Sequence, residues 1–195
     1  DLAINVLSVK DELGKDYNFT TSYSGNFMDL RIGDADILIS GIKTYRIKYQ
    51  IYNAIRADQT HDELYWNITG NQWPVVIQKA TATITLPKDS IPNINTACFT
   101  GPAGGTEKNC TAGQNSTDAT TINFDITKPL NTYEGLTTVV GIPLGYIDHT
   151  AAAQIPPHSF TANSSTVNSY QAENPYRMIV FIVLFFTVWI SLFLK

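Results

Sequence analysis

The sequence is poor in charged side chains, cysteine and basic clusters. Charged residues make up 15% of its 195 residues, against roughly 25% in an average soluble domain. The formal net charge is -4, and Lys and Arg form no block. Because phosphate binding needs clustered basic side chains, we expect no nucleic-acid partner. Two cysteines are too few for a small disulfide-dense scaffold.

Motifs for catalysis and cofactor binding are missing from the sequence. It has no Gly-x-Ser-x-Gly elbow, no phosphate-binding glycine loop that opens a helix, and no metalloprotease helix. His61-Asp62-Glu63 is the densest polar cluster. Adjacent residues of a strand point to opposite faces, so we expect a turn that leads into a strand there. Asp34 and Asp36 supply too few carboxylates for a calcium site. The sequence therefore predicts no enzyme activity, cofactor or metal, and it identifies no small-molecule ligand.

The C-terminal end of the sequence is a long apolar run. Residues 178–194 carry no charge and would span about 26 Å as a helix, slightly less than a hydrocarbon core. Tyr176 and Arg177 on one side and Lys195 on the other can anchor such a helix at the interfaces. We predict a transmembrane helix over residues 176–195. A buried core helix and a cleaved lipid-anchor signal are the alternatives.

Several features favour an extracytoplasmic position for residues 1–177. The sequence starts at Asp1 rather than Met, which fits removal of a signal peptide. Two cysteines and Asn-x-Ser/Thr sites fit an oxidising compartment. The possible glycosylation sites are Asn18, Asn67, Asn109, Asn115 and Asn163. We expect a single-pass protein of the plasma membrane with its N-terminal domain outside.

Alternation of apolar and polar residues predicts an antiparallel β-sandwich over residues 1–147. It is clearest at residues 44–51, 80–86 and 122–126. Weaker strand predictions cover residues 4–9, 17–23, 36–40, 64–68, 75–78 and 136–142. Residues 148–175 are small, polar and Pro-containing, and we expect a stalk there. An ordered strand packed on the sandwich is the alternative for this segment.

Alternation lapses over residues 87–120, a Gly- and Pro-containing segment that holds Cys98 and Cys110. Pairing these cysteines would close a loop and stabilise the fold by about 3 kcal/mol in the chain-entropy model. The alternative is two free thiols. A zinc site is not expected, because no His lies near the two cysteines in sequence.

Three aromatic residues surround Gly70. Tyr65 and Trp73, if exposed, could stack on a sugar ring or on a partner's side chain. Trp66 should lie on the opposite face of the strand from Tyr65. The alternative is that these rings pack in the core.

Two segments resemble a known family. G-I-K-T-Y-R-I-K-Y-Q-I-Y-N-A-I (residues 41–55) precedes D-E-L-Y-W-N-I-T-G-N-Q-W-P-V-V-I (residues 62–77). They resemble the domain-of-unknown-function 2207 family of predicted bacterial and archaeal membrane proteins. In that family a Y-x-I-x-Y strand leads to E-L-Y-W-N, G-x-x-W and a strand that ends in L-P. The matching parts here are residues 45–49, 63–67, 70–73 and 86–87, with Cys98, Gly101, Cys110 and residues 134–137.

The resemblance covers roughly residues 32–145 and implies architecture more than activity. It implies a signal peptide, an extracytoplasmic β domain and a membrane helix, often with further membrane segments and a low-complexity tail. It carries over no catalytic residues. Family members have strands before the part that matches Asp1 and further sequence after the first membrane helix. We therefore expect a fragment or a processed product, in which a missing strand would leave an exposed sheet edge.

The sequence as a whole predicts a membrane-anchored, non-catalytic subunit that binds or assembles at the cell surface. Its expected partners are the lipid bilayer and other protein subunits or copies of itself. A carbohydrate- or cell-wall-binding module is the first alternative. A surface hydrolase or metal-dependent enzyme built around His61 is the second.

Overall fold

The structure is a computed structural model that describes residues 3–24, 27–86, 94–114 and 120–147. All the regular secondary structure within these ranges consists of β-strands. None of the described residues forms a helix long and apolar enough to cross a membrane. The predicted stalk and membrane helix lie outside the described residues. So do the flanking residues Tyr176, Arg177 and Lys195 and the acceptor sites Asn115 and Asn163.

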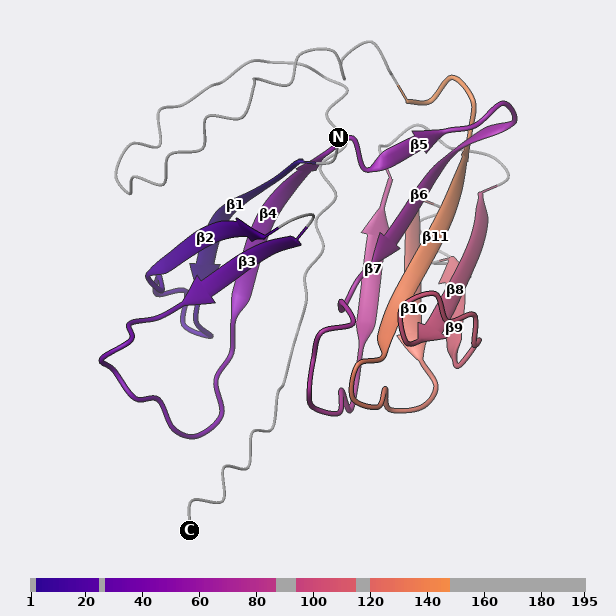
Figure 1. Ribbon diagram of the computed structural model, residues 1–195. Helices are drawn as coiled ribbons and strands as arrows, with labels where there is room; N and C mark the ends of the chain where they lie inside the picture. The colour runs from indigo at the N-terminus through magenta and orange to yellow at the C-terminus, as the bar shows by residue number, and fades with distance from the viewer. Residues whose placement is uncertain (1–2, 25–26, 87–93, 115–119, 148–195) are drawn as a thin grey trace.

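Seven strands form a sandwich of two antiparallel sheets (Figure 1). The four-stranded sheet has the order β5-β6-β11-β8 and the three-stranded sheet the order β7-β10-β9. Their bounds are Ile55–Ala57 (β5), His61–Asn67 (β6), Thr81–Thr85 (β7), Asn95–Gly101 (β8), Cys110–Gln114 (β9), Thr121–Ile126 (β10) and Gly135–Pro143 (β11). The predicted all-β antiparallel fold is thus confirmed for the described residues.

Four N-terminal strands form two further antiparallel pairs, which lie beside the sandwich in Figure 1. The pairs are β1 (Ala3–Lys10) with β4 (Arg46–Tyr52), and β2 (Phe19–Ser24) with β3 (Phe27–Ile32). The Tyr23 hydroxyl donates a hydrogen bond to the Ile4 carbonyl at 3.0 Å, which joins the second pair to the first. The described strands up to Tyr52 therefore form two small sheets of their own, although the predicted sandwich spanned residues 1–147.

The core lies between the two sheets of the sandwich, and residue size is matched across strands. Phe124 of β10 and Val140 of β11 are both fully buried. Phe124 lies opposite Ala82 of β7, so a large ring meets a small side chain. Two of the three clearest alternating runs in the sequence, residues 80–86 and 122–126, fall on β7 and β10, where every second side chain enters the core.

Tyr49 connects the N-terminal strands to this core. It belongs to β4, and it packs against the core of the sandwich beside Trp66 of β6. Burial raises the pKa of the Tyr49 hydroxyl, and the nearby indole N–H of Trp66 opposes that shift. The indole nitrogen is buried and falls short of full hydrogen-bond geometry with any acceptor among the described residues. The contact is therefore mainly one of apolar packing.

Two of the weaker strand predictions were wrong, and two strands in a third region were not predicted. Residues 36–40 form no strand, because the Asp34 carboxylate accepts the Asp36 backbone N–H at 3.0 Å and turns the chain. Residues 75–78 make only one bridge, between Ile77 and Leu130. The segment over residues 87–120 contains β8 and β9. These strands are rich in small residues, so their alternation is weak, and pairing with β11 and β10 holds them in place.

Replacing Phe124 with Ala tests the core. Phe124 is fully buried, so Phe124→Ala should lower the free energy of unfolding by about 3–5 kcal/mol. The control is Leu38→Ala, because Leu38 is 97% exposed and its change should stay within about 0.5 kcal/mol. Urea unfolding of the detergent-solubilised chain, followed by tryptophan fluorescence, measures both. Equal effects of the two substitutions would contradict the assigned core.

Candidate functional site

The turn after β6 carries the second half of the motif that resembles the family. The Asn67 side-chain oxygen accepts the Gly70 N–H at 2.9 Å, and Gly70 has a φ of +74°. The Trp73 indole N–H donates to the Thr69 carbonyl at 2.6 Å. The Asn71 amide donates to the Gly101 carbonyl at 2.9 Å. These bonds fold the turn onto itself and tie it to the end of β8.

The same turn also holds the start of β11. The Thr69 hydroxyl accepts the backbone N–H of Leu136 at 2.9 Å. Gly135 sits so close to the turn that an added Cβ would lie 2.8 Å from the Gly70 carbonyl oxygen. The polar residues of this motif are therefore used to pair β6, β8 and β11, and their roles are structural.

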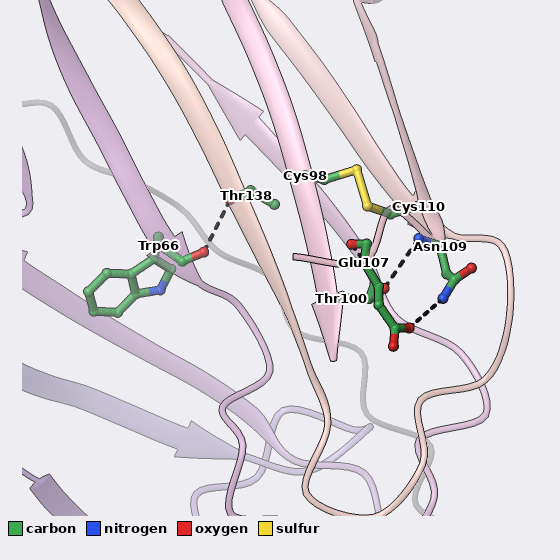
Figure 2. Close-up of a disulfide and its surroundings, with 7 residues drawn as sticks. All are labelled: Trp66, Cys98, Thr100, Glu107, Asn109, Cys110 and Thr138. Carbon is green, nitrogen blue, oxygen red and sulfur yellow. Dashed lines mark hydrogen bonds between the residues drawn. A yellow bond between two sulfur atoms is a disulfide. The ribbon is translucent and has the colours of Figure 1, made fainter. Parts of the chain in front are cut away.

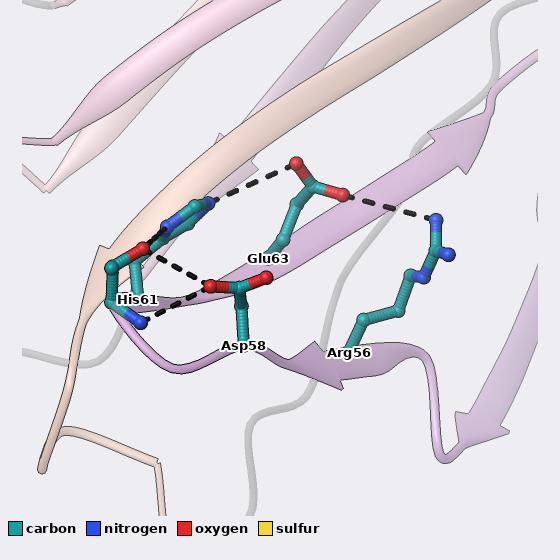
Figure 3. Close-up of polar contacts among 5 residues, drawn as sticks. Arg56, Asp58, His61 and Glu63 are labelled. Carbon is teal, nitrogen blue, oxygen red and sulfur yellow. Dashed lines mark hydrogen bonds and ion pairs between the residues drawn. The ribbon is translucent and has the colours of Figure 1, made fainter.

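His61 and Glu63 face each other on one side of β6 (Figure 3), whereas Asp62 lies on the other side, so the three do not converge. His61 begins β6 and lies 3.9 Å from the Glu63 carboxylate, which also faces Arg56 at 3.9 Å. Asp62 is fully buried, on the opposite face of β6. The arrangement matches the predicted turn and strand start.

The remaining contacts of His61 are equally local. Its Nδ1 lies 2.9 Å from the Thr60 hydroxyl. The Thr60 backbone N–H and then its hydroxyl lower the pKa of Asp58, which is exposed in the same turn. No group of three or more metal-ligating side chains occurs within the described ranges. Asp34 and Asp36 are exposed in the turn after β3. The polar contacts of His61 thus stay within its own hairpin.

A disulfide joins Cys98 of β8 to Cys110 of β9 (Figure 2). Because these strands belong to different sheets, the bond fastens one side of the sandwich. The segment between the cysteines is also hydrogen-bonded. The Thr100 N–H donates to the Glu107 carbonyl at 2.7 Å, and the Asn109 N–H donates to the Thr100 hydroxyl at 3.2 Å. The disulfide therefore sits in an ordered loop.

The proposed binding residues Tyr65 and Trp73 are both at the surface. Tyr65 is 46% exposed on β6, and Trp73 is 37% exposed in the loop between β6 and β7. Trp66 is half-buried and packs against the core, as the expected alternation requires. The two exposed rings lie on different elements, so each offers a separate contact.

The described acceptor sites differ in availability. Asn18 is exposed. The Asn67 side chain holds the turn after β6, and the Asn109 amide donates to the Glu107 carboxylate at 2.9 Å. A glycan would attach to the Asn67 amide nitrogen, which donates to the Asn71 side-chain oxygen in the same turn.

Sequence reasoning missed an exposed aliphatic run between β3 and β4. The exposed fractions are 65% for Ile37, 97% for Leu38, 57% for Ile39 and 63% for Ile42. Tyr133 was also missed, and it is 55% exposed. The available signal was a run of three consecutive aliphatic residues, which lacks the apolar–polar alternation of a half-buried strand.

Comparison with known proteins gives a matching family model and a relative that the chain matches over only part of its length. A family model described as "Predicted membrane protein (DUF2207) N-terminal domain" matches residues 4–142. The chain is also similar to "Uncharacterized protein YciQ" of Escherichia coli (strain K12), at 34% identity over 84 residues. That match covers 42% of this chain and 13% of the relative, so the chain spans a small part of that protein. No solved structure matches the chain.

Replacing Thr69 with Val tests the structural role of the turn. Thr69→Val removes the acceptor of the Leu136 N–H, and leaving that buried donor unpaired should cost about 1–3 kcal/mol of unfolding free energy. Thr83→Val is the matched control, because the Thr83 hydroxyl donates to Asn123 at an exposed site and its loss should cost little. Thermal unfolding in detergent compares them. Similar melting temperatures for both variants would refute this role.

Proposed function

The chain belongs to the DUF2207 family of predicted membrane proteins, and from this premise we propose that it is a membrane-anchored module outside the cytoplasm. In this proposal the β-sandwich binds or assembles with other subunits of a membrane complex and performs no catalysis. The observation that carries the proposal is the disulfide between β8 and β9, because such bonds form and persist in oxidising compartments. The apolar run over residues 178–194 would supply the anchor.

The local use of polar side chains supports a non-catalytic role. The polar residues of the turn after β6 bond to the backbones of β8 and β11, and His61 contacts Thr60 and Glu63 of its own hairpin. A hydrolase would need a nucleophile or a base aligned with a second group in a cleft. Nothing in the arrangement around His61 favours the hydrolase alternative.

A free sheet edge supports assembly. Within the described residues β7 pairs only with β10, so it forms an edge of the three-stranded sheet. The opposite edge strand, β9, is fastened to β8 by the disulfide. An unpaired strand edge offers backbone groups to an added strand from a partner. Of the two edges of the three-stranded sheet, we propose β7 as the contact with other subunits.

Native mass spectrometry of the full chain, extracted from its own membrane in mild detergent, tests this role. We expect it to leave the detergent with other subunits or further copies in a fixed ratio. Thr83→Lys on β7 should release the partner, because lysine at a sheet edge disfavours strand addition. Thr111→Lys on β9 is the matched control and should keep the partner. A lone monomer for the unmodified chain would contradict the assembly role.

Exposure of Tyr65 and Trp73 favours one second candidate, a carbohydrate-binding module. If either ring stacks on a sugar, Tyr65→Ala or Trp73→Ala should weaken retention on insoluble cell-wall polysaccharide by about two- to tenfold. Trp73→Phe keeps a ring and should retain binding. Tyr146→Ala is the control at another exposed tyrosine. Unchanged retention in both alanine variants would remove this candidate.

A further inference from the structure

We propose that the loop between β3 and β4 contacts the lipid bilayer in which the chain is anchored, together with the adjacent end of the sandwich. This inference rests on the proposed membrane anchor and goes beyond it, since it assigns a second, peripheral membrane contact to the domain. The contact residues are Ile37, Leu38, Ile39 and Ile42 of the loop, and Trp73 and Tyr133 of the sandwich.

The loop presents its aliphatic side chains to solvent by construction. Gly33 opens the loop and Gly41 lies within it, with φ values of +96° and +74°. The Gly33 N–H donates to the Asn18 carbonyl at 2.8 Å, which fixes the start of the loop to the strand pair β2–β3. The Asp34 turn then directs the chain outward. Leu38 follows and is 97% exposed. Exposing an aliphatic side chain to water is unfavourable and does not stabilise the loop.

The end of the sandwich adds two aromatic side chains. The Tyr133 N–H donates to the Trp73 carbonyl at 2.9 Å, so the two loops that carry these rings are bonded together. Tyr133 has a φ of +63°, an uncommon conformation for a bulky residue, and the residue is 55% exposed. Trp and Tyr are the residues that favour the membrane–water interface.

These elements share one end of the molecule. In Figure 1 the loop after β3, the loop from β6 to β7 and the loop from β10 to β11 all lie at the lower end of the view. The strand β11 ends at Pro143, at the opposite end. The exposed aliphatic run and the two exposed aromatic residues therefore belong to loops at the same end, although these loops are distant in sequence.

The tether makes a bilayer the expected occupant of this surface. Between Ile147 and Met178 the sequence has 30 residues, which reach at most about 100 Å. The nine residues of β11 span about 30 Å, so the chain can return past the sandwich and place its lower end on the membrane. A tethered domain meets the surface at a high effective concentration, and weak insertion of a few side chains then suffices.

The charges of the loop bear on the kind of lipid. Asp34, Asp36 and Lys43 give it a net charge of -1, so it offers anionic headgroups no net attraction. We therefore infer contact with lipids that carry no net charge, driven by burial of the aliphatic side chains.

A fluorescent label at position 38 tests the contact. Both native cysteines are paired, so Leu38→Cys provides one free thiol for a nitrobenzoxadiazole label. Asp125→Cys, on an exposed site of β10, is the matched control. The full chain is reconstituted in phosphatidylcholine vesicles with and without doxyl-labelled lipid. We expect a blue shift and lipid quenching at position 38 and neither at position 125. Ile39→Asp should abolish both effects at position 38.

The outcomes separate this inference from the proposed anchor. A chain that is removed from the vesicles by carbonate would overturn the anchor and this contact together. A chain that stays in the vesicles with a water-like label at position 38 would overturn the lipid contact alone. A blue shift without lipid quenching that grows with protein density would assign the loop to another copy of the chain, which also overturns it. Stronger quenching in phosphatidylglycerol vesicles would overturn the inferred preference for uncharged lipids.

Discussion

The hydrogen bond from the Leu136 backbone to the Thr69 hydroxyl joins residues 67 positions apart, and the four-stranded sheet is organised around it. It sets where β11 begins, and it does so against a turn that also holds the end of β8 through Asn71. Once β11 is fixed between β6 and β8, Val140 and Ile142 face the second sheet and meet its core. The polar contact at one end of the sandwich thus sets the position of β11, and apolar burial at the centre supplies most of the stability.

The two segments that resemble the family meet in space. Tyr49 lies in the first and Trp66 in the second, and the packing of these rings joins the N-terminal strands to the sandwich. The rest of the second segment forms the turn after β6. The residues by which the family can be recognised are therefore those that hold the domain together. Variation in function among relatives would then be expected at loops outside these segments, where substitution leaves the fold intact.

The parts of the fold that could be predicted are those in which burial follows from a single strand. Thr81–Thr85 and Thr121–Ile126 alternate because one face meets the core, and that pattern is visible in the sequence. β8 and β9 have no such pattern, since their places depend on neighbouring strands and on the disulfide. For the site, alternation separated Tyr65 from Trp66 correctly. The exposure of Leu38 was not predicted, because an aliphatic run is usually assigned to the interior, although this run lacks the alternation of a half-buried strand.

The disulfide has a consequence for the order in which the chain folds. Cys98 and Cys110 are separated by only 12 positions, whereas the bond from Leu136 to Thr69 links parts of the chain that are translated far apart. Closing a short loop requires a small loss of chain entropy, and contacts between distant residues form more slowly. In an oxidising environment the disulfide can therefore link β8 to β9 before β11 is added to its sheet. One side of the sandwich is then already closed when β11 pairs, and fewer wrong strand pairings compete with the native one.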